Sequence, residues 1–299
     1  MAYTLNRMEM EIALDMLSQP KDEYLRIRMV CLLKNCLQEV VTDYAFIVDE
    51  FPNFNIIIGR PKDLNSCSSE TWPCYWSPMF YILREDKNDA LFRKMMLNND
   101  VIDWTRNKRK SLFIYGVSGT QKAVFDEVAA IYGWLPRGGH LEGKAFSIKN
   151  DDIHKALIEV PSMKQLTCST LRLDEAVLVQ RRWQHILADD PNVTTGIEFC
   201  IKNFPNICLR NDKGEVIGHM LTLYNGEMLM LNVTEFHRRQ GLGTAVQLLL
   251  CRKIYEQNRR PVWTVLANNE PSLQMNAKMG AQLLDNGKIM YGSRYKYIN

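Results

Sequence analysis

The stretch of sequence that decides the fold is Leu229-Met230-Leu231-Asn232-Val233-Thr234-Glu235-Phe236-His237-Arg238-Arg239-Gln240-Gly241-Leu242-Gly243-Thr244-Ala245. It begins as an apolar strand, continues as a basic turn with two glycines, and enters a helical pattern that runs to residue 257. The first backbone N–H groups of a helix have no partner within that helix. Because Gly241 and Gly243 let a ligand come close to those groups, the segment predicts a phosphate-binding turn.

The basic residues of the turn strengthen this prediction. Arg238 and Arg239 each carry a guanidinium fork that matches phosphate oxygens. A dinucleotide-binding loop would need the spacing GxGxxG and an acidic residue further along, whereas the chain has Arg238-x-x-Gly241-x-Gly243. A plain turn with surface arginines is the alternative to a phosphate site.

Local patterns place this segment in a regular series of elements. Asn225-Gly226 between apolar runs predicts a hairpin, because both positions tolerate a positive φ. Asp174 is expected to cap a helix. In the second half of the chain we expect strands at 169–173, 207–210, 216–224, 227–233, 262–267, 281–284 and 288–297, and helices at 174–186, 193–204, 241–257 and 272–278.

The first half of the chain also predicts a mixture of helices and strands. Two polar segments, 138–144 and 149–155, are the best candidates for a linker. We therefore predict an α/β (α+β) fold in two domains, residues 1–150 and residues 163–299. In the first half we expect helices at 8–17, 24–37, 89–104 and 119–132, and strands at 51–61, 72–83 and 112–115.

Length and composition agree with a folded, two-domain protein. The 299 residues suit two domains of about 150 residues each. The protein has 46% hydrophobic and 24% charged residues, a composition that excludes a disordered chain. The formal charge of +3 divides into −2 before residue 161 and +5 after it. This modest basic excess suits a small polyanionic ligand better than DNA, so no nucleic-acid partner is expected.

Cysteine usage and the N-terminus bear on the compartment. The eight cysteines show no CxxC spacing and no matching histidines, so we expect no metal site and free thiols in an intracellular protein. No apolar run reaches the roughly 18 residues of a membrane helix, so no membrane partner is expected. Glu9, Glu11 and Asp15 argue against a mitochondrial presequence.

In its strand–turn–helix context, Arg238-x-x-Gly241-x-Gly243 resembles the loop with which the GNAT superfamily of acyl-CoA-dependent N-acyltransferases holds the pyrophosphate of coenzyme A. Segments 49–61, 200–209 and 226–238 resemble the glycine N-acyltransferase family, and the likeness is clearer after residue 165. It implies a GNAT catalytic domain in the C-terminal half, with a divergent GNAT-like domain packed on it. It also implies acyl transfer from acyl-CoA to the amine of a small amino acid such as glycine, giving an N-acyl amino acid and CoA.

The resemblance assigns roles to individual residues. Glu227 matches the family's proposed catalytic glutamate. A base is needed because an amine attacks a thioester only when it is neutral, and a carboxylate can take its proton. A solvated residue at a strand edge is the alternative. Val233 matches the position whose backbone N–H faces the thioester oxygen. Contacts to the coenzyme are expected from Val233, Arg238, Arg239, Gln240, Gly241, Leu242, Gly243, Thr244, Asn269 and Ser272.

Some of these assignments have alternatives. Asn269 and Ser272 equally fit a helix N-cap. Where GNAT proteins often carry a tyrosine that protonates the departing thiolate, the chain has Met275-Asn276, and asparagine cannot be that acid. The thiolate would then take its proton from water or from the attacking amine.

Other functions stay open at this point. His219 or His237 would serve as an alternative base or ligand. A GNAT enzyme that acetylates a peptide, lysine or polyamine is one rival, and a non-catalytic acyl-CoA-binding protein is another. We expect a monomer. The family resemblance implies a mitochondrial location, and a cytoplasmic one is the alternative.

Overall fold

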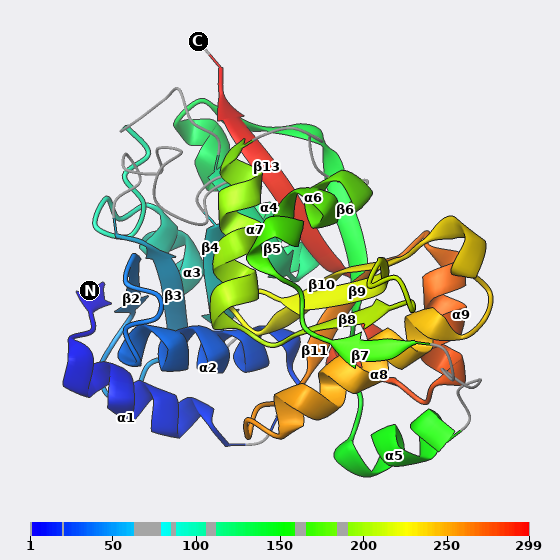
Figure 1. The fold of residues 1–299 in the computed structure, drawn as a ribbon. Coiled ribbons are helices and arrows are strands. Elements are labelled where there is room, and N and C mark those ends of the chain that lie inside the picture. Colours follow the sequence, from blue (N-terminus) through cyan, green and yellow to red (C-terminus); the bar gives the residue numbers. More distant parts are fainter. Residues whose placement is uncertain are drawn as a thin grey trace. The chain divides into compact units, whose positions relative to one another are not determined.

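The computed structural model describes residues 2–19, 21–62, 79–84, 88–105, 112–158, 166–183 and 191–298. The chain divides into two compact units, coloured along the sequence in Figure 1. The first unit comprises Met1–Lys144 together with Asp285–Asn299, and the second comprises Ala145–Leu284. The last strand of the chain therefore folds with the first unit. Residues 72–78 of one expected strand lie outside the described residues.

The first unit is built on a mixed sheet whose strands follow the order β1-β2-β3-β4-β5-β13-β6. Only the β4–β5 pair is parallel among the pairs described within this unit. Its elements are β1 (Tyr3–Thr4), α1 (Arg7–Leu17), α2 (Tyr24–Leu37), β2 (Tyr44–Val48), β3 (Ile56–Pro61), β4 (Met79–Arg84), α3 (Asp89–Met96), β5 (Leu112–Val117), α4 (Gly119–Ile131), β6 (Trp134–Ser147), η4 (Asp285–Gly287) and β13 (Met290–Tyr297).

Aromatic side chains fill the core of the first unit. The ring centroids of Trp104 and Phe125 lie 5.4 Å apart, and those of Phe125 and Tyr295 lie 4.9 Å apart. The Trp134 indole N–H donates to the Trp104 carbonyl at 3.0 Å. These buried rings thus contribute apolar area while the Trp134 donor keeps a partner.

Helix α3 is shorter than expected, since it ends at Met96 instead of residue 104. The Asn98 carbonyl accepts the N–H groups of Val101 and Ile102, which turns the chain out of the helix. The Trp104 indole N–H then donates to the Met96 carbonyl at 2.7 Å. This bond satisfies one of the carbonyls that a helix end leaves free.

The segments predicted as a linker are regular structure, so that prediction is wrong. Residues 138–144 lie within strand β6, and residues 149–155 fall largely in helix α5 (Asn150–Ile158). Strand β6 pairs with β13 from Trp134↔Tyr297 to Gly143↔Met290. Its partner strand comes from the C-terminal end of the chain, and no local pattern in residues 138–144 indicates that pairing.

The second unit is a sheet with the order β6-β11-β10-β9-β8-β7, in which β6 contributes its C-terminal end and also pairs with β12. The β10–β11 pair is parallel, and β7 to β10 are antiparallel. Besides α5 its elements are β7 (Thr167–Ser169), η2 (Leu173–Glu175), α6 (Ala176–Arg182), α7 (Pro191–Asn203), β8 (Asn206–Arg210), β9 (Val216–Thr222), β10 (Glu227–Val233), η3 (Glu235–His237), α8 (Leu242–Tyr255), β11 (Val262–Leu266), α9 (Glu270–Lys278) and β12 (Gln282–Leu283).

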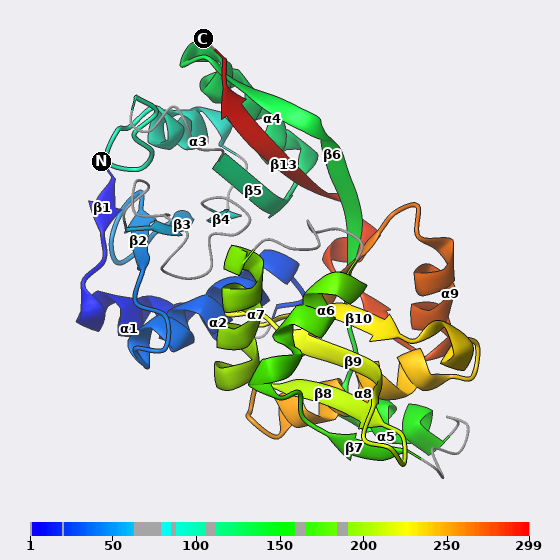
Figure 2. The same cartoon turned by 45° about the horizontal axis from the view of Figure 1, so that its top comes forward.

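Helices cover both faces of this second sheet, with α6 and α7 on one face and α8 on the other (Figure 2). A Cβ on Gly218 of β9 would lie 3.2 Å from Val246 of α8, so α8 packs closely on the strand. Phe146 stacks on Trp263 in the core beneath α8, with ring centroids 6.3 Å apart. The predicted mixed α/β architecture is confirmed.

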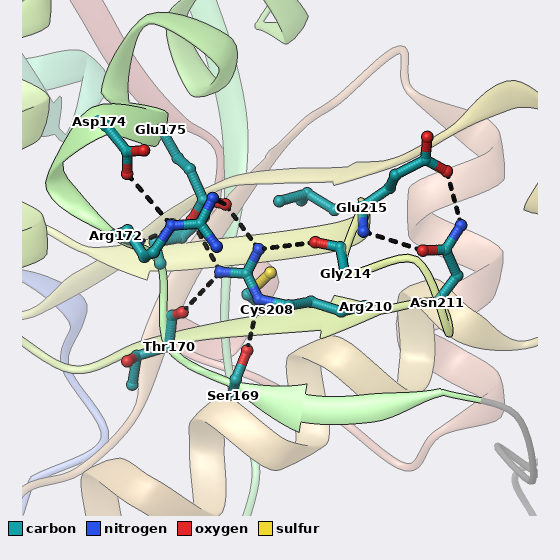
Figure 3. A network of polar contacts seen from close by, with 12 residues as sticks. Ser169, Thr170, Arg172, Asp174, Glu175, Cys208, Arg210, Asn211, Gly214 and Glu215 are labelled. Carbon is teal, nitrogen blue, oxygen red and sulfur yellow. Dashed lines mark hydrogen bonds and ion pairs between the residues drawn. The ribbon is translucent and has the colours of Figure 1, made fainter.

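A buried ion pair holds the start of α6 against the sheet (Figure 3). Both Nη atoms of Arg210 donate to the carboxylate of Glu175, at 2.6 and 2.8 Å. The Arg172 N–H also donates to Glu175, at 2.7 Å. Burial opposes the charge of Glu175, but these hydrogen bonds and the two arginine charges hold its pKa below the ordinary range. Glu175, not the expected Asp174, therefore makes the capping contact at this helix start.

Candidate functional site

The turn between β10 and α8 leaves backbone N–H groups available. Arg239 and Gly241 both adopt left-handed backbone conformations, with φ values of 61° and 77°. Gly241 is the N-cap of α8, and no side chain of the described residues caps this helix end. Among the residues that the structure describes, a partner is found in the first turn for the Ala245 N–H alone, which bonds to the Gly241 carbonyl at 3.0 Å. The N–H groups of residues 242–244 therefore lie at the positive end of the helix dipole, where an anion could accept their hydrogen bonds.

The two glycines of the turn serve different purposes. Gly241 provides the left-handed conformation that bends the chain into the helix. Gly243 has an ordinary φ, but a Cβ there would lie 3.3 Å from Sδ of Met275 and 4.0 Å from the side chain of Val233. Gly243 therefore allows α8 to approach α9 and the end of β10. The exposed side chains of Arg238, Arg239 and Gln240 surround this helix start.

Strand β10 has an open edge. It pairs with β11 only at Glu227↔Val262 and Met228↔Trp263 within the described structure, and the two parallel strands have no registered pairs beyond that point. A bulge lies further along β10, where Met230 has a φ of 60°. Backbone groups after Met228 on the β11 side are thus left for a ligand. An extended molecule with amide groups can bind such an edge as an added strand does.

The open edge leads directly to the basic turn. The Thr234 N–H donates to the Ile217 carbonyl of β9 at 2.9 Å. Because successive residues of a strand direct their N–H groups to opposite sides, the Val233 N–H points toward the β11 side. The Val233 carbonyl accepts a bond from Nε of Arg238 at 3.0 Å. This bond uses one of the five guanidinium N–H groups and holds Arg238 at the end of the open edge.

Glu227 is buried, so a solvated strand-edge role is excluded; its side chain is 2% exposed. Its carboxylate accepts a hydrogen bond from the Thr264 hydroxyl of β11 at 2.8 Å, and its N–H donates to the Asn225 side chain at 3.0 Å. The hairpin before it has three loop residues, because the Leu223 N–H bonds to the Glu227 carbonyl. Within the Asn-Gly pair, Gly226 has a positive φ of 83° and Asn225 does not, although the hairpin prediction allowed a positive φ at both positions.

The structure does not bring Glu227 and Val233 together. They stand at opposite ends of β10, about 20 Å apart at roughly 3.3 Å per residue. One reacting carbon cannot contact both. The bulge at Met230 lies about 10 Å from Glu227 by the same spacing, so its backbone is better placed for chemistry that involves this carboxylate.

The expected coenzyme contacts on α9 have structural partners of their own. The Asn269 side-chain oxygen accepts the Ser272 N–H at 3.3 Å, which is the N-cap alternative. Asn269 is nevertheless exposed, and its NH₂ group has no part in that bond. Asn276 is fully buried, and its oxygen accepts bonds from Trp263 at 2.8 Å and Gln247 at 3.2 Å. The absent tyrosine is thus replaced by a residue that joins α9 to the core.

Neither histidine has the geometry of a general base at this site. His237 Nδ1 lies 2.9 Å from the hydroxyl of Thr234 within the turn. His219 is fully buried, and burial together with the charge of Arg182 lowers its pKa to about 3. Sequence reasoning missed the burial of Glu227 and its contact with Thr264, because 37 residues separate the two.

Other expectations concern metals, thiols and membranes. In the part of the chain that the structure describes, no three His, Cys, Asp or Glu side chains come together as a metal site. Six cysteines of the described ranges are free thiols, and Cys67 and Cys74 lie outside those ranges. No helix among the described residues combines the length and apolar character needed to cross a bilayer.

Known proteins resemble the chain in sequence and in fold. The model of the FR47-like protein family matches residues 207–289, which include the open edge, the turn and α9. Glycine N-acyltransferase of Bos taurus is 22% identical over 253 residues, which cover 79% of each chain. The enzyme of the same name from Rattus norvegicus is 22% identical over 211 residues, covering 66% of this chain and 67% of the relative.

Solved structures extend the likeness over the whole chain. A Drosophila protein of a structural genomics programme superposes with a TM-score of 0.74 at 16% identity, covering 98% of this chain and 97% of that one. A tandem GNAT protein of the clavulanic acid biosynthesis pathway covers 99% and 97% with a TM-score of 0.56 at 13% identity. The chain has a fold like that of the tandem GNAT protein and is similar in sequence to the glycine N-acyltransferases. These likenesses support acyltransferase activity.

Proposed function

We propose that this protein transfers an acyl group from acyl-CoA to the amine of a small amino acid, giving an N-acyl amino acid and CoA. The observation that carries the proposal is the open edge of β10, which ends at the uncapped start of α8. An anion-binding helix start that continues into a row of free backbone amides suits a molecule with a pyrophosphate and an amide-bearing arm. The relatives named glycine N-acyltransferase support an amino acid as the acceptor.

The coenzyme would lie along these two features. The N–H groups of Leu242, Gly243 and Thr244 would hold the pyrophosphate, with Arg238 and Arg239 pairing its charge. Gln240 and Gly241 would border it in the turn. The Val233 N–H would bond to the arm, and the exposed NH₂ group of Asn269 and the neighbouring Ser272 would contact it from α9. No resident metal is needed for thioester aminolysis of this kind.

The reaction would take place near the bulge of β10. The amine of the acceptor attacks the thioester carbon, and Glu227 takes the amine proton, directly or through one water. Charge develops on the carbonyl oxygen, and backbone N–H groups at the bulge would stabilise it better than Val233, which lies too far from Glu227. The C–S bond then breaks, and CoA leaves as a thiolate that takes up a proton. With Asn276 buried in the core, that proton comes from water or from the amine.

Thiol release from acetyl-, benzoyl- and longer acyl-CoAs with a panel of amino acids tests the proposal. We expect thiol release that depends on the amine and an N-acyl amino acid among the products. Peptides and polyamines in the same panel test the rival acetyltransferases. Binding of CoA without thiol release for any amine at any pH would overturn the enzymatic proposal in favour of a binding protein.

A further inference from the structure

The hydroxyl of Thr264 lies between the carboxylate of Glu227 and the open part of β10. It donates a hydrogen bond to Oε1 of Glu227 at 2.8 Å. Glu227 is buried, whereas Thr264 is partly exposed. A general base must come within hydrogen-bond reach of the proton that it removes, or reach it through one bridging group such as a water. The Thr264 hydroxyl is placed to be that bridging group.

The strand register sets Thr264 at the point where β10 and β11 separate. The last registered pair of these strands is Met228↔Trp263. Thr264 is the next residue of β11, so it stands level with Leu229, where the bulge of β10 begins. Glu227 lies two residues before Leu229 on β10. Its carboxylate must therefore lean along the strand, toward the open edge, to accept the bond from Thr264.

Glu227 and Thr264 lie on the same face of the sheet. Their neighbours in the chain, Met228 and Trp263, belong to the core beneath α8. Because side chains alternate along a strand, Glu227 and Thr264 point to the opposite face, which carries α6 and α7 (Figure 2). The base and the hydroxyl thus share one face at one end of the open edge.

Thr264 is closer to the bulge than the backbone of Glu227 is. Met230 lies about 10 Å from Glu227 along the strand, whereas the level of Thr264 is only about 3 Å from it at roughly 3.3 Å per residue. The strand beyond the bulge is held in place, because the Asn232 side chain donates to the Arg182 carbonyl at the end of α6, at 3.2 Å. An amine that attacks a thioester at the bulge would therefore meet the hydroxyl before the carboxylate.

A threonine hydroxyl has the chemistry that a proton relay needs. It can accept one hydrogen bond while it donates another. Its proton is directed at Oε1 of Glu227, so Oγ1 acts as an acceptor toward the amine. A hydroxyl that donates to a carboxylate is also a stronger acceptor, because hydrogen bonds in a chain polarise one another.

We propose that Thr264 relays the proton of the acceptor amine to Glu227. As the nitrogen lone pair forms the C–N bond with the thioester carbon, one N–H proton passes to Oγ1 of Thr264 and the hydroxyl proton passes to Oε1 of Glu227. Thr264 is unchanged, and Glu227 becomes a carboxylic acid. When the C–S bond breaks, its electron pair leaves with sulfur. The thiolate takes up one proton and Glu227 gives one up, which regenerates the carboxylate.

This inference rests on the proposed acyl transfer and adds a second catalytic residue to it. Steady-state kinetics of the full chain test it, with glycine and whichever of acetyl-, benzoyl- or longer acyl-CoA releases thiol fastest. Thr264→Val removes the hydroxyl and nearly keeps the side-chain shape. It should lower kcat about 100-fold or more with little change in KM, since a positioned acid–base group contributes that factor. Thr264→Ser keeps the hydroxyl and should retain most of the activity. A wild-type kcat in Thr264→Val would overturn the relay.

Thr222→Val is the matched control, because it makes the same change on the neighbouring strand β9. Thr222 is buried and pairs directly with Met228, so it lies on the α8 face, away from Glu227. Its hydroxyl has no hydrogen-bond partner within the part of the chain that the structure describes. We expect an unchanged kcat and a Tm that is not lowered. Equal losses of kcat in the two valine variants would overturn the relay.

Two further measurements separate a relay from mere support of the fold. Glu227→Gln combined with Thr264→Val should be no slower than Glu227→Gln alone, because both changes break the same proton path; additive losses would overturn the relay. The wild-type kcat in mixtures of light and heavy water should fall along a curve, because two protons move in one step. A linear dependence, or none, would overturn the relay without recourse to any variant.

Failure of the proposed function gives a different result. A wild-type protein that releases no thiol with any amine would reject the acyl transfer and the relay together. Thiol release by the wild type that Glu227→Gln slows and Thr264→Val does not would reject the relay alone. Thiol release that Glu227→Gln leaves unchanged would also reject the relay and keep the acyl transfer.

Discussion

Gly241→Ala is expected to weaken CoA binding about tenfold, whereas Gly243→Ala should change it less than about twofold. Gly241 has a φ of 77°, and an L-residue in the left-handed region costs about 1–2 kcal/mol. This backbone strain would arise in the turn that directs the N–H groups of residues 242–244 toward the ligand. If the turn relaxes to avoid the strain, these groups diverge, and a loss of about 1.4 kcal/mol corresponds to a tenfold weaker Kd.

Gly243 is the control because its Cβ would point into the protein, away from the ligand. It would lie 3.3 Å from Sδ of Met275, the end of a flexible side chain that can yield by a few tenths of an ångström. Titration calorimetry with CoA on the folded full-length variants measures both effects, and urea unfolding reports their stability. Equal weakening by the two alanines, or greater weakening by Gly243→Ala, would refute the phosphate-turn geometry.

Three further predictions concern the base, the ion pair and the buried asparagine. Glu227→Gln should lower kcat most near neutral pH and recover toward alkaline pH, where the amine is already neutral; a mutant-to-native rate ratio that stays flat across pH would speak against the base. Glu175→Gln should cost about 3 kcal/mol of unfolding free energy at pH 7. Because the folded-state pKa of Glu175 is lowered, its contribution is present above the unfolded value of about 4.3 and disappears as the pH falls through the folded value, so urea unfolding in acid should show a smaller difference. Asn276→Leu should cost about 2 kcal/mol by leaving the Trp263 and Gln247 donors unpaired, and a stability equal to wild type would contradict the bonds described.

The part of the fold that sequence predicts best is the part whose signals are local. The strand Glu227–Val233 and the helix after Gly241 follow from an apolar run, a glycine turn and helical periodicity within thirty residues. Strand β6 was not predictable in this way, because its partner β13 lies about 150 residues further along the chain and its own glycines and charges are typical of a loop. Tertiary pairing overrides local preference there.

The site shows the same division. The turn between β10 and α8 is visible in sequence as Arg238, Gly241 and Gly243, since one short segment builds it. The burial of Glu227 depends on Thr264, and the fixation of Asn232 depends on the end of α6, fifty residues earlier. Such contacts arise only when strands and helices assemble. Local sequence patterns therefore predict the turn itself, whereas its surroundings depend on contacts between distant segments.

A structure of the full chain with CoA tests the central claim most directly. The account predicts the pyrophosphate within hydrogen-bond distance of the N–H groups of residues 242–244, with the arm along the open edge of β10 between Val233 and the bulge. CoA bound elsewhere on the chain, or an arm that makes no contact with the backbone of β10, would contradict it.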